Sequence, residues 1–166
     1  MILGMSTATF TFLHVLLSMV GIASGLAVMY GFLNGSRMDR LTAIFLVTTV
    51  LTSITGFGFP FEQLLPSHKV GIISLVMLAV AIPARYVLHL AGPWRLTYVV
   101  SAAMALYLNV FVLLVQLFLK VPALKALAPT QKEPPFLVAQ LVVLALFVGL
   151  TILAAKKFRV ESAQTA

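Results

Sequence analysis

Four polar side chains recur along one long apolar segment, residues 98–120, and they are the strongest candidates for a site. These residues are Ser101, Asn109, Gln116 and Lys120, separated by 8, 7 and 4 positions. Such spacings place them near one stripe of an α-helix. A polar group in hydrocarbon is costly unless a neighbour satisfies it, so the stripe is expected to face protein or water. The functional interpretation is a polar lining for a small site, and the competing one is an inter-helix hydrogen bond through Asn109 with Lys120 extending outward to the membrane surface.

Two other apolar segments carry groups that would complete such a site. His14 donates, accepts or ligates near neutral pH, and an ionisable residue in a span is a functional candidate; the competing interpretation is a hydrogen bond to a nearby loop. Thr48 and Thr52 share one helix face with Thr55. Their hydroxyls bond to carbonyls of their own helix at little cost, which favours simple packing. The functional interpretation is a hydroxyl-lined path beside the stripe.

Three basic residues, two near the end of the third apolar segment and one just before the fourth, have a different expected role. Arg85 and His89 are four residues apart and share a helix face, and Arg95 follows Trp94. We expect Arg85 to extend to the lipid headgroups, with a lipid-phosphate site as the functional alternative. Arg95 is expected to anchor the next helix at the membrane surface.

The composition identifies an integral membrane protein. The 166 residues are 61% hydrophobic and 9% charged, with a mean hydropathy of +1.11, whereas soluble domains are roughly 25% charged. The net charge of +7 is therefore attributed to topology and anionic headgroups, and no nucleic-acid partner is expected. The lack of cysteine excludes disulfides and thiolate chemistry.

The apolar pattern predicts an all-α bundle of five transmembrane helices. The expected spans are about 10–33, 41–60, 70–90, 97–119 and 135–155. Together they form a single transmembrane domain, 1–160, followed by a short polar tail at 161–166. Lys and Arg divide seven against four between the two sides, which predicts an outside N-terminus and a cytoplasmic C-terminus. No cleaved signal peptide is expected because the first basic residue is Arg37, and either Met1 or Met5 is the native start.

A resemblance covers most of the chain. The run from Ala105 to Phe136 is ALYLNVFVLLVQLFLKVPALKALAPTQKEPPF, and it is preceded by Ala84-Arg85-Tyr86, His89-Leu90-Ala91-Gly92 and Trp94-Arg95. These segments are similar to small, functionally uncharacterised multi-pass proteins of the bacterial inner membrane. The resemblance implies that location. It implies no activity and assigns no functional residues.

Redox and metal chemistry have weaker support. Haem held by two histidines needs both at matching depth; His14 and His89 are predicted near opposite faces, and His68 in a loop. A haem with one ligand, or one shared between chains, stays open. A metal held by His14, His68 and Glu62 or Glu133 lacks any specific spacing. An intramembrane enzyme using His14 with Glu133 is the least supported reading, so no catalytic residue, metal or cofactor is predicted.

The sequence favours an oligomeric channel or transporter for a small solute or ion, with its polar site toward the outer face. The residues expected to form the path are Asn109, Gln116, Lys120, Ser101, His14, Thr48 and Thr52. The alternative is a non-catalytic subunit of a larger membrane complex that holds a quinone, haem or lipid. In either case the expected partners are membrane lipids and further copies of the chain.

Overall fold

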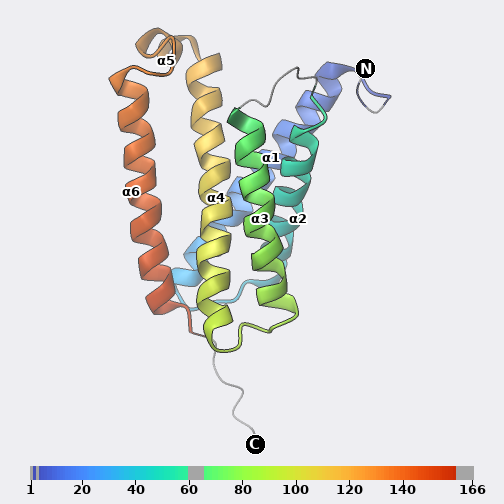
Figure 1. Cartoon of the computed structure of the whole chain (residues 1–166), viewed down its shortest axis with the longest axis vertical. Helices are drawn as coiled ribbons and strands as arrows, with labels where there is room; N and C mark the ends of the chain where they lie inside the picture. The colour runs from blue at the N-terminus through green and yellow to red at the C-terminus, as the bar shows by residue number, and fades with distance from the viewer. Residues whose placement is uncertain (1, 3, 60–65, 160–166) are drawn as a thin grey trace, which may run out of the picture.

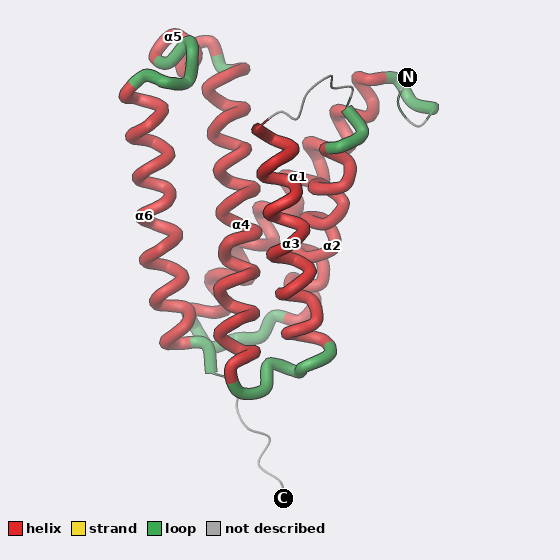
Figure 2. Tube along the Cα trace, viewed as in Figure 1, coloured by secondary structure: helices red, strands yellow, loops and turns green. Residues whose placement is uncertain are grey.

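The computed structural model describes residues 2, 4–59 and 66–159, and it is built from helices joined by loops (Figures 1 and 2). Met1, Glu62, position 60 at the predicted end of the second span, and the predicted tail at 161–166 lie outside the described residues. The helices are α1 (Thr7–Leu33), α2 (Asp39–Gly56), α3 (Pro66–Tyr86), α4 (Pro93–Lys120), α5 (Pro122–Leu127) and α6 (Pro134–Lys157).

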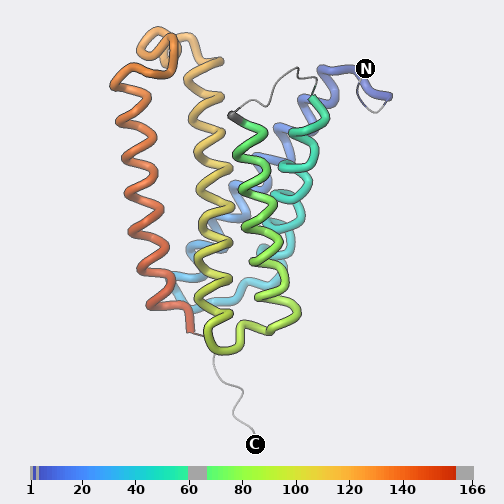
Figure 3. Tube along the Cα trace, viewed as in Figure 1, coloured from blue at the N-terminus to red at the C-terminus, as the bar shows by residue number. Residues whose placement is uncertain are grey.

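The long helices α1, α2, α3, α4 and α6 alternate in direction along the bundle (Figures 1 and 3). One end holds the C-terminus of α4 together with α5, and we name it the Lys120 end. The opposite end holds the C-terminus of α3, and we name it the Arg85 end. The predicted seven-to-four distribution of basic residues falls between these two ends, with seven at the Arg85 end. Which end faces the cytoplasm stays a prediction.

Four helices, α1, α3, α4 and α6, are long and apolar enough to cross a membrane. Together with the composition, they are consistent with a multi-pass helical membrane protein. Their bounds agree with four of the predicted spans to within a few residues, except that α3 ends at Tyr86. The chain then turns through His89 and Leu90, which both have positive φ, so the prediction that His89 shares a helix face with Arg85 is wrong. The second predicted span corresponds to α2, which has 18 residues, begins with Asp39 and Arg40, and carries six hydroxyl side chains.

A glycine on α1 brings three helices into close contact. A Cβ added to Gly25 would lie 2.6 Å from Leu106 Cδ1 of α4 and 2.8 Å from Phe45 Cδ2 of α2. Small residues permit this approach between membrane helices. Between this contact and the Arg85 end, a continuous apolar core fills the bundle, and its largest fully buried side chains include Phe32, Leu78 and Tyr98.

The Arg85 end is fixed by two arginines that bond within the protein. The Arg85 side chain is 1% exposed, forms an ion pair with Asp39 and donates to the Arg37 carbonyl oxygen at 3.0 Å. Its guanidinium also lies 5.1 Å from the centre of the Tyr98 ring. A buried charge needs such partners. Arg85 therefore differs from the expectation that it extends to the lipid headgroups.

Arg95 stabilises the end of α6. Its Nη1 donates to the carbonyl oxygen of Ala155 at 2.9 Å and also to that of Phe158. A cation hydrogen-bonded to the last carbonyls of a helix stabilises that terminus. Arg95 thus links the beginning of α4 directly to the end of α6. Its expected role in anchoring α4 at the membrane surface stays a prediction.

The connection from α4 to α6 contains α5, a short helix that the sequence pattern did not predict. Gln131 donates to the Val115 carbonyl oxygen at 2.8 Å, and the Phe118 and Phe136 rings meet edge to face at 5.3 Å. Glu133 accepts from the Thr130 hydroxyl at 2.8 Å and from the Lys132 backbone N–H at 3.0 Å. These contacts hold the C-terminus of α4, and with it Lys120, against the beginning of α6.

The Gly25 contact predicts a loss of stability on a minimal substitution. Gly25→Ala places a methyl group against Leu106 and Phe45, and overpacking of this kind costs about 1–3 kcal/mol. We expect a lower Tm in detergent, measured by circular dichroism. The matched control is Gly149→Ala on α6, where an added Cβ meets no atom within 4 Å and the Tm should be unchanged or higher. Equal effects of the two variants would contradict the packing account.

Glu133 makes the α5–α6 connection sensitive to pH. Desolvation alone would raise the pKa of Glu133, but hydrogen bonds from Thr130 and Lys132 outweigh it and lower the pKa below its usual value. A carboxyl group whose pKa is lowered by folding stabilises the folded state above its unfolded-state pKa. This stabilisation is lost as the pH falls through the folded-state pKa. We expect the hydrogen-exchange protection factors of the Thr130 and Lys132 amides to fall on acidification in that range. Protection that stays constant in the wild type and in Glu133→Gln would exclude this role.

Candidate functional site

A cavity of about 430 Å³ lies between α1, α2, α3 and α4 in the half of the bundle toward the Lys120 end. Pockets of this size suit small molecules. Its polar lining comes from all four helices: Thr11, His14, Ser18, Thr52, Ser53, Ser67, His68, Ser74, Asn109, Gln116 and Lys120. Most of the other lining residues are aliphatic or aromatic. The cavity therefore has an apolar body with polar groups distributed around it.

The polar stripe of α4 supplies one wall of this cavity. Asn109, Gln116 and Lys120 line it in order toward the Lys120 end. Ser101 does not line it; the Ser101 hydroxyl is buried and donates to the Thr97 carbonyl oxygen at 2.7 Å. The structure thus brings three of the four stripe residues together, and it brings His14 and Thr52 to the same cavity.

The inner end of the cavity borders a cluster of polar groups around Gly21. A Cβ added to Gly21 would lie 3.2 Å from Thr48 Oγ1, 3.3 Å from Thr49 Oγ1 and 3.7 Å from Asn109 Nδ2. Asn109 Nδ2 donates to Thr49 Oγ1 at 3.3 Å. Thr48 bonds to the Ile44 carbonyl oxygen at 2.7 Å and is not among the lining residues. Of the two threonines of the predicted hydroxyl path, Thr52 therefore lines the cavity and Thr48 does not.

His14 lines the cavity and bonds to a hydroxyl of α2. Its Nδ1 lies 2.8 Å from Thr55 Oγ1, and either atom donates according to the tautomer of the ring. The Thr55 hydroxyl also lies 2.7 Å from the Leu51 carbonyl oxygen. No described residue bonds to His14 Nε2, so this nitrogen is open to a ligand as a donor or as an acceptor.

His68 corrects one sequence prediction. We expected it in a loop, but it lies in the first turn of α3, is 4% exposed and lines the same cavity as His14. Its ring stacks on Phe57 with centroids 5.5 Å apart, and the Phe59 ring meets His14 edge-on at 5.2 Å. The signal for this helix start was Pro66, because proline favours the first position of a helix. Two histidines of one chain therefore border one cavity, His68 from a helix where we expected a loop.

Two polar side chains of the lining have unused hydrogen-bonding capacity. Thr52 Oγ1 is buried and bonds to no atom of the described residues. Gln116 is half-buried and makes no side-chain hydrogen bond to another described residue. A buried polar group without a partner is costly, so such groups favour a polar ligand or water in the cavity.

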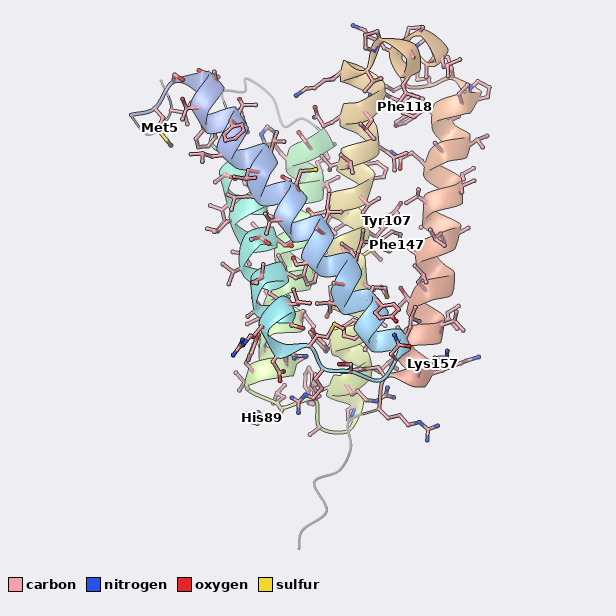
Figure 4. All side chains as sticks on the ribbon, turned by 180° about the vertical axis from the view of Figure 1, so that it is seen from behind. Met5, His89, Tyr107, Phe118, Phe147 and Lys157 are labelled. Atoms are coloured by element: carbon pink, nitrogen blue, oxygen red, sulfur yellow. The ribbon has the colours of Figure 1, made fainter. Side chains whose placement is uncertain are left out.

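The cavity reaches the surface of the bundle between α1 and α4. The lining residues Val15 and Met19 on α1 are 43% and 39% exposed, and Leu117 on α4 is 38% exposed. On its other side α4 packs against α6, where the Tyr107 and Phe147 rings lie 5.7 Å apart (Figure 4). Helix α4 therefore has a cavity face and a separate packing face.

A shallow basic hollow lies at the opposite, Arg85 end. It is bordered by His89, Arg95, Lys156 and Arg159, and Figure 4 shows His89 and Lys157 at this end of the molecule. The expectation of a headgroup contact therefore remains a prediction for His89 and Arg95. Arg85, by contrast, is enclosed by its ion pair.

Neither the metal-ligating side chains nor a comparison with known proteins assigns a role to these sites. Among residues 2, 4–59 and 66–159, no three His, Asp or Glu side chains come close enough to hold a metal ion. The candidate ligand Glu62 lies outside those residues, and Glu133 bonds within its own turn. No protein-family model, curated protein or solved structure matches the chain.

The chain has no cysteine, so the cavity is open to a direct accessibility test. Ser18 and Ser24 lie on the same helix, and each donates to a carbonyl oxygen four residues earlier. Ser18 lines the cavity, whereas Ser24 is 6% exposed in the packed region. We expect a small water-soluble thiol reagent to modify Ser18→Cys and to leave Ser24→Cys unmodified. Equal rates of modification would exclude a water-accessible cavity.

Proposed function

We propose that this protein is a membrane transporter that binds a small solute in the cavity between α1, α2, α3 and α4. The observation that carries the proposal is the convergence of Asn109, Gln116 and Lys120 with His14 in one cavity within an otherwise apolar bundle. Polar groups that converge in a concave apolar pocket are the usual form of a ligand site. Polar residues inside membrane helices are expensive and mark solute pathways.

A solute carrier fits this geometry better than an open channel. The cavity occupies one half of the bundle, while the other half is filled by the core around Phe32, Phe45 and Leu106. A solute that enters from the Lys120 end would therefore meet packed side chains near Asn109. Passage would require the helices to rearrange at the Gly25 contact, which is the behaviour of a carrier with alternating access.

We also propose how the protein lies in the membrane. All five long helices would cross the bilayer, with the Lys120 end outside and the chain in a bacterial inner membrane. In α2, hydroxyls bond to carbonyls of their own helix, as Thr48 does to Ile44, which lowers the cost of burying that helix in lipid. Asp39 of α2 is paired with Arg85. We further propose that the chain forms homo-oligomers, for which native mass spectrometry after gentle extraction is the test.

A quinone-holding subunit is the second candidate. Two observations favour it: the His14 ring lines the cavity, where it would hydrogen-bond a quinone carbonyl or a quinol hydroxyl, and the cavity reaches the α1–α4 surface, where a lipid-soluble molecule would enter. A quinone retained on purification, detected by its ultraviolet spectrum, would favour this role over solute transport.

Flux through reconstituted vesicles tests the transport proposal. Gln116→Leu removes a cavity amide that bonds to no described residue, so the fold should persist while flux of the transported solute falls about tenfold. Asn109→Leu should abolish flux. The matched control is Gln140→Leu at the α4–α6 contact, outside the cavity, where flux should be unchanged. Wild-type flux in folded Gln116→Leu and Asn109→Leu would exclude the proposed path.

A further inference from the structure

The charges that border the cavity indicate the class of its ligand. Among the described lining residues, Lys120 alone carries a formal charge, apart from the titratable imidazoles of His14 and His68. The two described acids are committed elsewhere: Asp39 pairs with Arg85 at the opposite end, and Glu133 bonds to Thr130 and Lys132 in its own turn. The ammonium group of Lys120 therefore has no carboxylate partner within the cavity lining that the structure describes.

The surroundings of Lys120 increase its preference for an anion. Lys69, Lys125 and Lys132 lie at the same end of the bundle, where Glu133 is the one described acid, so the described residues at this end carry a net positive charge. Lys120 is itself exposed at the mouth of the cavity, so solvent and salt weaken its attraction for an anion but leave its sign. A single negative charge on the ligand would satisfy the ammonium, whereas a cationic ligand would be repelled.

The apolar part of the lining favours an apolar body on the same ligand. Below Lys120, the α4 wall continues through Leu117, Leu113 and Val112, and the facing α1 wall is formed by Val15 and Met19. Burying hydrocarbon against these side chains contributes roughly 25 cal/mol per Å². Because the cavity reaches the bundle surface between α1 and α4, an amphiphilic molecule would enter with its charged group at the membrane interface.

We propose that the cavity binds a small organic monoanion with an apolar body, of which a medium-chain monocarboxylate is the simplest. Its carboxylate is paired with Lys120 and its hydrocarbon lies between α1 and α4. This inference rests on the proposed function, because it names the ligand class of the same cavity. It makes Lys120 the residue that selects for charge, while the α1 and α4 side chains select for an apolar body.

The test compares octanoate with octanamide, which have nearly the same shape but differ in charge at pH 7.5. Binding is measured by calorimetry with the purified protein in nanodiscs, with protein-free nanodiscs as the blank. We expect octanoate to bind about threefold more tightly than octanamide, the size of effect that a solvent-exposed charge pair gives. Lys120→Gln should remove that preference by weakening octanoate alone. Lys125→Gln on α5, which does not line the cavity, should leave both affinities unchanged.

A cavity-filling variant distinguishes an error in the proposed ligand class from an error in the proposed binding site. Leu113→Trp, or Met19→Trp on the facing wall if the first variant does not fold, should abolish binding of both probes. Equal affinities for octanoate and octanamide, both lost in the filled variant, would overturn the anion inference and leave the cavity as a binding site. Octanoate binding that persists in a folded filled variant would overturn the inference, and so would the absence of binding above the blank. Normal flux of the transported solute through vesicles that contain the filled variant would overturn the proposed function as well.

Discussion

The close approach of α1 to α2 and α4 at Gly21 and Gly25 is the constraint on which the rest of the bundle depends. At Gly25 the neighbouring Leu106 and Phe45 leave no room for even a methyl group. One turn away, Gly21 faces the hydroxyls of Thr48 and Thr49. From this contact toward the Arg85 end the helices enclose an apolar core; toward the Lys120 end α1 crosses the bundle obliquely and the cavity forms (Figures 1 and 4). Packing thus sets where the polar groups of α4 meet the other helices.

The two ends of the bundle use cationic side chains in different ways. At the Arg85 end, Arg85 and Arg95 bond to Asp39 and to backbone carbonyls, so their charges stabilise the ends of helices. At the Lys120 end, Lys120 borders an apolar cavity whose described lining contains no acid. The first arrangement fixes structure, and the second leaves a charge available to a ligand. This difference is the physical basis for placing function at the Lys120 end.

The sequence was informative where one helix alone determined the outcome. Seven and four residues separate Asn109, Gln116 and Lys120, which keeps them on one face, whereas the eight residues from Ser101 to Asn109 turn a helix about 80° beyond two full turns. Ser101 accordingly lies outside the cavity. Contacts between helices that are distant along the chain could not be predicted from the sequence. For example, Arg85 forms its ion pair with Asp39, 46 positions away. His68 was wrongly placed in a loop because the apolar run begins at Val70, although Pro66 marks the helix start.

Photoaffinity labelling tests most directly the central claim that the cavity is a ligand site. The probe is a medium-chain carboxylate with a diazirine in its chain, irradiated with the protein in nanodiscs, and the modified residues are mapped by mass spectrometry. The account predicts adducts on the facing walls, at residues such as Met19 and Leu113, that are suppressed by excess octanoate. Adducts spread over the exposed surface of α6, at residues such as Val148, and unaffected by octanoate would contradict it.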